Sequence, residues 1–169
     1  MKRVIGIDPG SQRTGWGIVE TAGTRCTYVA SGVVDLRKLE SLTAKLGHLA
    51  DEIERILQDH KPTVAAIESV FHGKNAKSAL VLGQARGAAI STIGRSALEC
   101  VELSPAEIKL SVAGHGKADK QQVAQMVERL LQIELKGPSD ESDALAIAIA
   151  GGSMVATSTH AWLAKQGLR

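Results

Sequence analysis

The sequence predicts an α/β fold with a mixed five-stranded sheet that is flanked by helices on both faces. Two observations support this prediction. Three strand-like segments near the N-terminus are joined by short turns, which is typical of an antiparallel meander. Beyond them, two further strand-like segments alternate with segments of helical spacing, which is typical of parallel strands joined by crossovers.

The meander begins with a short apolar run from Val4 to Ile7, which indicates a strand buried on both faces. This strand ends at Asp8, where a Pro-Gly turn stops it. The second and third strands are expected over residues 14–20 and 25–34, with a turn at Gly23. The remaining strands are expected over residues 64–68 and 98–103.

Five helices are predicted from apolar spacing, with Ser41, Ser104 and Asp119 as N-cap residues. They are expected over residues 41–60, 75–93, 105–112, 119–131 and 140–150. Small residues in the second helix allow either close packing on the sheet or a subunit interface, and both interpretations stay open.

The chain of 169 residues is long enough to bury a substantial core. We expect one domain over residues 1–156, followed by a tail, residues 157–169, whose composition allows flexibility. No apolar run approaches the length of a membrane span, so a cytoplasmic protein without a membrane partner is expected. Cys26 and Cys100 are isolated in the sequence, which suggests buried thiols in a reducing compartment.

Four carboxylates occupy comparable places in the predicted elements. Asp8 and Glu68 each end an apolar strand, and Asp140 and Asp143 share one face of the first turn of the last helix. If the strand ending at Glu68 lies parallel to the first strand, both acids leave the sheet at the same edge. The alternatives are that Asp8 caps its own turn and that the other two only complement the helix dipole.

Carboxylates without His or Cys neighbours form an all-oxygen site, which suits Mg²⁺ or Mn²⁺ better than zinc. Such ions can activate water and stabilise the leaving oxygen of a phosphodiester. A structural ion is the alternative.

Basic residues follow Glu68 without acidic neighbours. No Asp or Glu occurs between Ser69 and Leu98, a stretch that contains Lys74, Lys77, Arg86 and Arg95. Lys109, Lys117 and Lys120 come soon after. These cations could contact phosphates, or they could form an ordinary solvated surface, since the formal net charge is only +2.

Four motifs together resemble the bacterial RuvC family of Holliday-junction resolvases, over about residues 3–150. They are Gly6-Ile7-Asp8-Pro9-Gly10-Ser11 with Thr14-Gly15, Ala66-Ile67-Glu68-Ser69-Val70-Phe71, Lys74-Asn75-Ala76-Lys77-Ser78-Ala79-Leu80 with Leu82-Gly83-Gln84-Ala85-Arg86-Gly87, and Asp140 with Asp143-Ala144-Leu145-Ala146-Ile147-Ala148.

The resemblance implies a ribonuclease H-like fold and a homodimer that cleaves four-way DNA junctions in recombination and repair. It implies paired, symmetric nicks in opposing strands, by hydrolysis that depends on one or two Mg²⁺ ions per subunit, with Mn²⁺ as a substitute. The branch-migration proteins RuvA and RuvB are the implied protein partners.

By the same resemblance, the metal-binding acids are Asp8, Glu68, Asp140 and Asp143. Phe71 matches an aromatic residue near the junction bases, and Lys109 and Lys120 match basic positions near the DNA backbone and the scissile phosphate. The basic stretch adds Lys74, Lys77, Arg86 and Lys117 as expected DNA contacts.

Three other functions are weighed against this one. An ATP-binding protein of the sugar-kinase and actin type would need a second Asp-x-Gly turn and a second lobe, for which the chain is too short. A nuclease of the same fold could act on RNA, and a junction-binding module could lack catalysis. Four intact acids argue against the last of these.

Overall fold

The computed structural model describes residues 1–23, 25–69 and 76–165, with side chains described up to residue 155. Within this part of the chain the order of elements is the predicted one. The elements are β1 (Lys2–Asp8), β2 (Arg13–Ala22), β3 (Arg25–Asp35), α1 (Leu42–His60), β4 (Val64–Glu68), α2 (Ala76–Arg95), β5 (Glu99–Leu103), α3 (Pro105–Ala113), α4 (Lys120–Leu131) and α5 (Ser139–Lys165).

The five strands form one mixed sheet in the order β3-β2-β1-β4-β5. The first three strands pair antiparallel, as the predicted meander requires. Strand β4 then pairs parallel to β1, and β5 pairs parallel to β4. Strand β1 is therefore central, and four successive residues from Val4 to Ile7 are buried.

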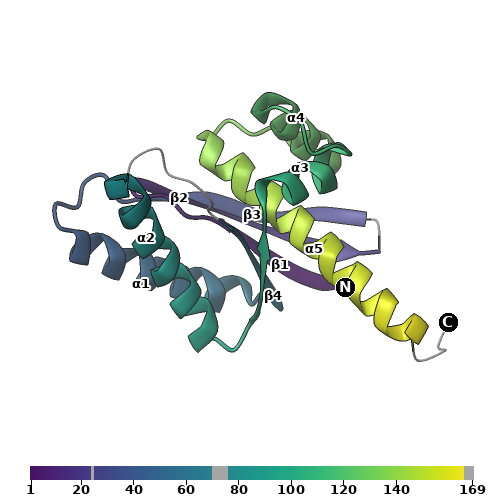
Figure 1. Cartoon of the computed structure of the whole chain (residues 1–169), viewed down its shortest axis with the longest axis horizontal. Helices are drawn as coiled ribbons and strands as arrows, with labels where there is room; N and C mark the ends of the chain where they lie inside the picture. Colours follow the sequence, from purple (N-terminus) through teal and green to yellow (C-terminus); the bar gives the residue numbers. More distant parts are fainter. Residues whose placement is uncertain (24, 70–75, 166–169) are drawn as a thin grey trace.

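Helices cover both faces of the sheet, as predicted (Figure 1). Helices α1 and α2 pack on one face, where Ile5, Ile7 and Ile67 meet Leu49 and Ile53. Helices α3, α4 and α5 cover the other face, which carries a second apolar cluster. The sheet thus separates two cores, and α5 lies along its middle strands (Figure 1).

The predicted helix starts are confirmed. Ser41, Ser104 and Asp119 each accept a backbone N–H of the following turn, and the latter two form capping boxes with Glu107 and Gln122. Helix α1 ends at His60, and its C-cap residue, Lys61, has a left-handed φ of 49° directly before Pro62.

The expectation that the last helix ends at residue 150 is wrong. Helix α5 continues through Gly151 and Gly152 to Lys165. A Cβ atom at Gly151 would lie 2.5 Å from Cβ of Ala66, and one at Gly152 would lie 2.6 Å from Cγ2 of Thr21. These glycines therefore allow the helix to lie close to the sheet and do not end it.

Cys26 and Cys100 are free and only partly buried, so the expectation of buried thiols holds only in part. Both pack against the edges of the apolar clusters. In the part of the chain that the structure describes, no helix combines the length and the apolar composition that a membrane crossing requires.

Candidate active site

Asp8 and Glu68 lie at one edge of the sheet, because their strands run in parallel. In the register of β1 and β4, Ile7 is opposite Ile67, so the next residue of each strand is an acid. Each acid is the last residue of its strand. The carboxyl ends of parallel strands are where open α/β sheets place their sites.

The first turns of α5 reach this edge because glycines lie beneath them. A Cβ atom at Gly15 would lie 2.0 Å from the backbone oxygen of Asp140, and one at Gly6 would lie 2.2 Å from the oxygen of Ala144. A side chain at either position would push the helix away from β1 and β2. These two glycines thus bring the start of α5 close to Asp8.

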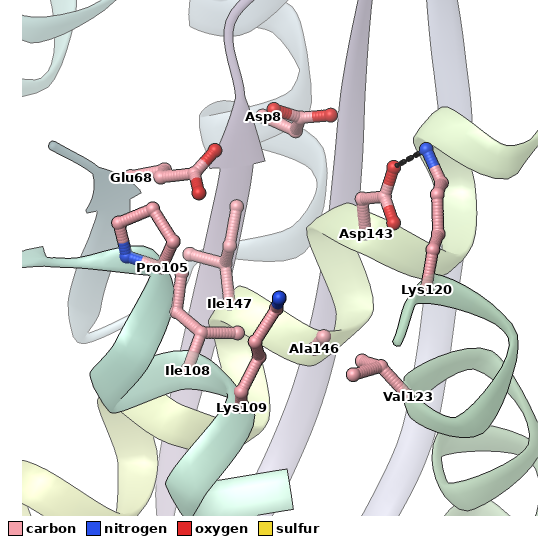
Figure 2. Close-up of a pocket in the computed structure, with 10 residues that line it drawn as sticks. All are labelled: Asp8, Glu68, Pro105, Ile108, Lys109, Lys120, Val123, Asp143, Ala146 and Ile147. Carbon is pink, nitrogen blue, oxygen red and sulfur yellow. Dashed lines mark ion pairs between the residues drawn. The ribbon is translucent and has the colours of Figure 1, made fainter. Parts of the chain in front are cut away.

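A cavity of about 220 Å³ joins three of the predicted acids to two of the predicted lysines. Figure 2 shows Asp8, Glu68 and Asp143 around it, with Lys109 of α3 and Lys120 of α4 extending toward them. Its apolar wall comes from α3, α4 and α5, through Pro105, Ile108, Val123, Ala146 and Ile147. The cavity combines crowded carboxylates, two cations and a partly apolar wall.

Two of the acids, Asp8 and Glu68, have raised pKa values. Burial is the largest cause that raises the pKa of Asp8 to about 7, and the charges of Asp143, Glu68 and Asp140 add to it. Burial and the charge of Asp143 also raise the pKa of Glu68. Negative charge therefore exceeds positive charge in the site, although the charges of Lys109 and Lys120 act to lower the pKa of Glu68.

Lys120 supplies the nearest cation. Its Nζ lies 2.6 Å from Oδ2 of Asp143, and this hydrogen bond is the main cause of the raised pKa of Lys120. Because Asp119 caps α4, Lys120 is the first residue of that helix and projects toward the acids (Figure 2).

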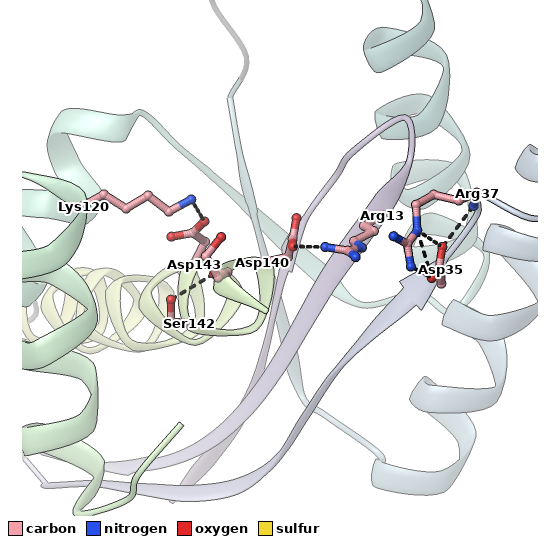
Figure 3. Close-up of polar contacts among 8 residues, drawn as sticks. Arg13, Asp35, Arg37, Lys120, Asp140, Ser142 and Asp143 are labelled. Carbon is pink, nitrogen blue, oxygen red and sulfur yellow. Dashed lines mark hydrogen bonds and ion pairs between the residues drawn. The ribbon is translucent and has the colours of Figure 1, made fainter. Parts of the chain in front are cut away.

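Asp140 lies to one side of the other three acids. Its Oδ2 is 3.9 Å from an Nη atom of Arg13, and both residues line a second, polar pocket with the turn from Gly10 to Gln12 and with Arg37 (Figure 3). The pKa of Asp8 still responds to the charge of Asp140. Asp140 is therefore near the site but outside the lining of the main cavity.

Arg13 is a residue that sequence reasoning missed. The sequence signal that could have found it is its position at the start of the second strand of a hairpin. The first strand of that hairpin ends at Asp8, which pairs with Gly15. Such a position returns to the edge at which the acids lie. Which partner it would meet there depended on where α5 begins.

The turn-cap interpretation of Asp8 is not supported. The hydrogen bonds of this turn involve Thr14, which is fully buried. Its hydroxyl accepts from the Gly10 N–H at 3.3 Å and donates to the Gly10 carbonyl at 3.4 Å. Among the described residues, burial and neighbouring charges account for the state of Asp8, without a hydrogen bond.

The donor set suits a hard divalent cation, although the described side chains do not form a ready coordination shell. Among these residues, no three or more His, Cys, Asp or Glu are grouped to hold an ion. Lys120 instead pairs with Asp143, and Arg13 lies nearest Asp140. Donors that are all carboxylate oxygens fit Mg²⁺ or Mn²⁺, whose charge would relieve the repulsion between the acids.

The other expected DNA contacts are spread more widely. Lys117 is exposed in the loop between α3 and α4, and Lys77 is exposed in the first turn of α2. Arg86 is partly buried and is bonded within the protein. Phe71 and Lys74 lie outside the described residues.

An antiparallel meander extended by parallel strands, with acids at the strand ends and at the start of the covering helix, defines a nuclease of the ribonuclease H-like class. The comparisons narrow this class. The model of the family "Crossover junction endodeoxyribonuclease RuvC" matches residues 4–151, and the chain belongs to this family.

Curated relatives agree with this assignment. The RuvC protein of Hyphomonas neptunium is 43% identical over 147 residues, which are 87% of this chain and 88% of the relative. That of Acinetobacter baumannii is 46% identical over 158 residues, which are 91% of this chain and 87% of the relative.

Solved structures agree as well. T. thermophilus RuvC in complex with Holliday junction substrate superimposes with a TM-score of 0.88 at 28% identity, over 94% of this chain and 98% of that chain. The yeast mitochondrial resolvase Ydc2 shares the fold, with a TM-score of 0.68 at 15% identity, over 94% of this chain and 81% of that chain.

Proposed function

We propose that this protein resolves four-way DNA junctions by hydrolysing phosphodiester bonds in two opposing strands, in the cytoplasm, during recombination and repair. The observation that supports it most is the cavity in which Asp8, Glu68 and Asp143 face Lys109 and Lys120. The superposition on a RuvC structure that contains a junction makes DNA of this shape the proposed substrate. RNA remains the competing substrate.

In this proposal Asp8, Glu68, Asp140 and Asp143 hold one or two Mg²⁺ ions, with Mn²⁺ as a substitute. A bound divalent ion would lower the pKa of a water molecule and stabilise the leaving oxygen. Burial, and after it the charges of neighbouring acids, raise the pKa values of Asp8 and Glu68, so cation binding favours their charged forms.

The lysines are proposed to position the DNA. Lys109 and Lys120 line the cavity and could contact the phosphates beside the cleaved bond. The exposed Lys77 and Lys117 would contact phosphates farther away. Phe71 and Lys74, which lie outside the described residues, are also proposed to contact the junction. When metal and DNA bind, Lys120 would have to give up its ion pair with Asp143 in order to contact a phosphate.

Two arms in one experiment test the function. Wild-type protein is incubated with a four-way junction, linear duplex and structured RNA in Mg²⁺, and the junction should be cut in preference to both others. Asp8→Asn should still bind the junction while cleavage falls by at least about a hundredfold, because one acid of the cluster loses its charge. Asp51→Asn, an exposed position on α1, is the matched control and should cut like wild type.

Equal cutting by wild type and Asp8→Asn would contradict the proposed site. Preference for structured RNA would favour the competing substrate. Melting temperatures of all three proteins are measured beside activity, so that a variant that fails to fold is recognised.

The protein partners are also proposed from the family. We expect the branch-migration proteins RuvA and RuvB to accompany this enzyme on a junction. Binding of this protein to a junction preloaded with RuvA and RuvB, followed by sedimentation, checks the expectation. Exclusion of the enzyme from that assembly would contradict it.

A further inference from the structure

Arg86 connects three elements at the end of the strand that carries Glu68. Its Nε–H donates to the backbone carbonyl of Glu68 at 3.0 Å, and its Nη2 pairs with the carboxylate of Glu102 on β5. The Arg86 side chain is only 20% exposed, whereas that of Arg95 on the same helix is 65% exposed. Arg95 lies 3.8 Å from the carboxylate of Glu54.

The peptide that follows Glu68 lies where β4 leaves its central neighbour. Pairing of β4 with β1 ends at Ile67, while on the other side Ser69 donates its N–H and its hydroxyl to the Leu103 carbonyl at 2.7 and 3.1 Å. The Glu68 carbonyl receives its hydrogen bond from the Arg86 guanidinium. A charge-assisted bond of this kind is stronger than a neutral one. The orientation of this peptide fixes the direction in which the Glu68 side chain leaves the strand.

Arg86 reaches the main chain of Glu68 and not its carboxylate. The charged side chains that act on that carboxylate are those of Asp143, Lys109 and Lys120. The charge of Arg86 is also balanced by Glu102, so this residue offers little net attraction to a phosphate. Its geometry therefore favours a role inside the protein over the DNA contact expected from its place in the basic stretch.

We propose that Arg86, held by Glu102, is a positioning residue that fixes the end of β4 so that Glu68 points into the active-site cavity. This inference rests on the proposed function in one respect, namely that Glu68 takes part in catalysis. The hydrogen bonds themselves do not depend on that function.

The test replaces the guanidinium by an apolar chain of similar length, Arg86→Met. Junction affinity, measured in Ca²⁺, should stay within about twofold of wild type, and its salt dependence should not change, because no phosphate contact is lost. The single-turnover cleavage rate in Mg²⁺ should fall by about ten- to a hundredfold, since small misplacements of a reacting group have effects of this size. The Mg²⁺ concentration for half-maximal cleavage should rise.

Matched variants separate this role from others. Arg95→Met removes a cation from the same helix and should leave cleavage, affinity and Mg²⁺ dependence unchanged. Glu102→Gln should give a smaller loss of the same kind, and the double variant should be no slower than Arg86→Met alone, because the two residues act as one unit. Arg86→Lys should restore part of the rate.

Hydrogen exchange of the Ser69 amide gives a readout that is independent of activity. This amide bonds to the Leu103 carbonyl beside the Arg86 contact, so its exchange should become faster in Arg86→Met. If wild-type protein cleaves no junction, the proposed function fails while the exchange experiment still tests the positioning. A weaker affinity with a shallower salt dependence would make Arg86 a DNA contact and overturn the inference, as would normal cleavage with unchanged exchange. A large fall in melting temperature in Arg86→Met would leave Glu102→Gln to decide by the same measurements.

Discussion

At the scale of single residues, Asp8 is under the greatest electrostatic strain in the site. It ends a strand buried on both faces, and three other acids act on it. A buried carboxylate in such surroundings favours its protonated form until a cation arrives. The same crowding that suits an ion should therefore destabilise the metal-free protein at neutral pH.

This strain predicts a dependence of stability on pH. The pKa of Asp8 rises from 3.8 to about 7 in the folded protein, so its contribution to stability is fully present below about pH 4 and is lost as the pH rises through 7. In EDTA, the free energy of unfolding should fall by roughly 2 kcal/mol between pH 5.5 and pH 8. Glu68, whose pKa is also raised, contributes in the same direction.

Urea unfolding of wild type, Asp8→Asn and Asp51→Asn over this pH range measures the effect. Asp8→Asn should show a much flatter profile and be the most stable at pH 8, and Asp51→Asn should follow wild type. An Asp8→Asn profile as steep as that of wild type would contradict this origin of the strain.

At the scale of elements, the site depends on how closely α5 lies on the sheet. Gly6 and Gly15 on neighbouring strands leave no room for a side chain beneath the helix. The hydroxyl of Ser31 on β3 also donates to Glu141 at 2.6 Å, which fixes the first turn from another side. Glu141 is thereby directed to β3, while Asp143, two residues later, faces the cavity.

Substitution of Gly15 should therefore damage the site. In Gly15→Ala the added methyl group would lie 2.0 Å from the Asp140 carbonyl oxygen, so the first turn of α5 has to move. We expect a loss of about 1–3 kcal/mol in stability, as for overpacked cores, together with a marked fall in cleavage. Gly47→Ala in α1, where nothing lies within 4 Å of the new atom, should instead be neutral or stabilise by up to about 1 kcal/mol.

Thermal unfolding and junction cleavage of both variants check this prediction. A Gly15→Ala protein that matches wild type in both measurements would show that α5 can shift without affecting its acids.

At the scale of the whole molecule, paired nicks in opposing DNA strands require two active sites. A homodimer would supply them, because each chain contributes the acids of one site. Helix α2 offers the surface that we propose for a homodimer. One of its faces is buried through Ala85, Ala89 and Ile93, which supports packing within the subunit. On its other side Leu80 is 65% exposed, and Gly83 has open space around it. Both earlier interpretations of this helix can therefore hold, one for each face.

Charge at Leu80 should separate the subunits. Wild type is expected to sediment at twice the chain mass of 17.8 kDa, and Leu80→Glu at about the single mass, because the carboxylate would be buried in the interface. Leu110→Glu on α3, where the leucine is 57% exposed, is the control and should remain dimeric. Monomeric wild type would contradict the proposed homodimer, and dissociation by Leu110→Glu alone would place its interface elsewhere.

The sequence by itself determined the order of the secondary-structure elements and singled out the candidate acids of the site. Its apolar periodicity identified every strand, and Ser41, Ser104 and Asp119 identified helix starts, because caps and periodicity are local properties. The parallel pairing of β1 and β4 also followed, since a strand reached through a helix returns in the same direction. This was enough to bring Asp8 and Glu68 to one edge.

Only the tertiary structure decided which distant residues contact Gly151, Gly152 and Arg86. Gly151 and Gly152 looked like a helix end, although they serve contact with Ala66 and Thr21, which are remote in the sequence. Arg86 looked like one cation of a basic stretch, although its bonds go to Glu68 and Glu102. The local sequence allows a glycine to end a helix or to permit close contact, and an arginine to face solvent or to bond within the protein. Packing between distant segments selects among these roles.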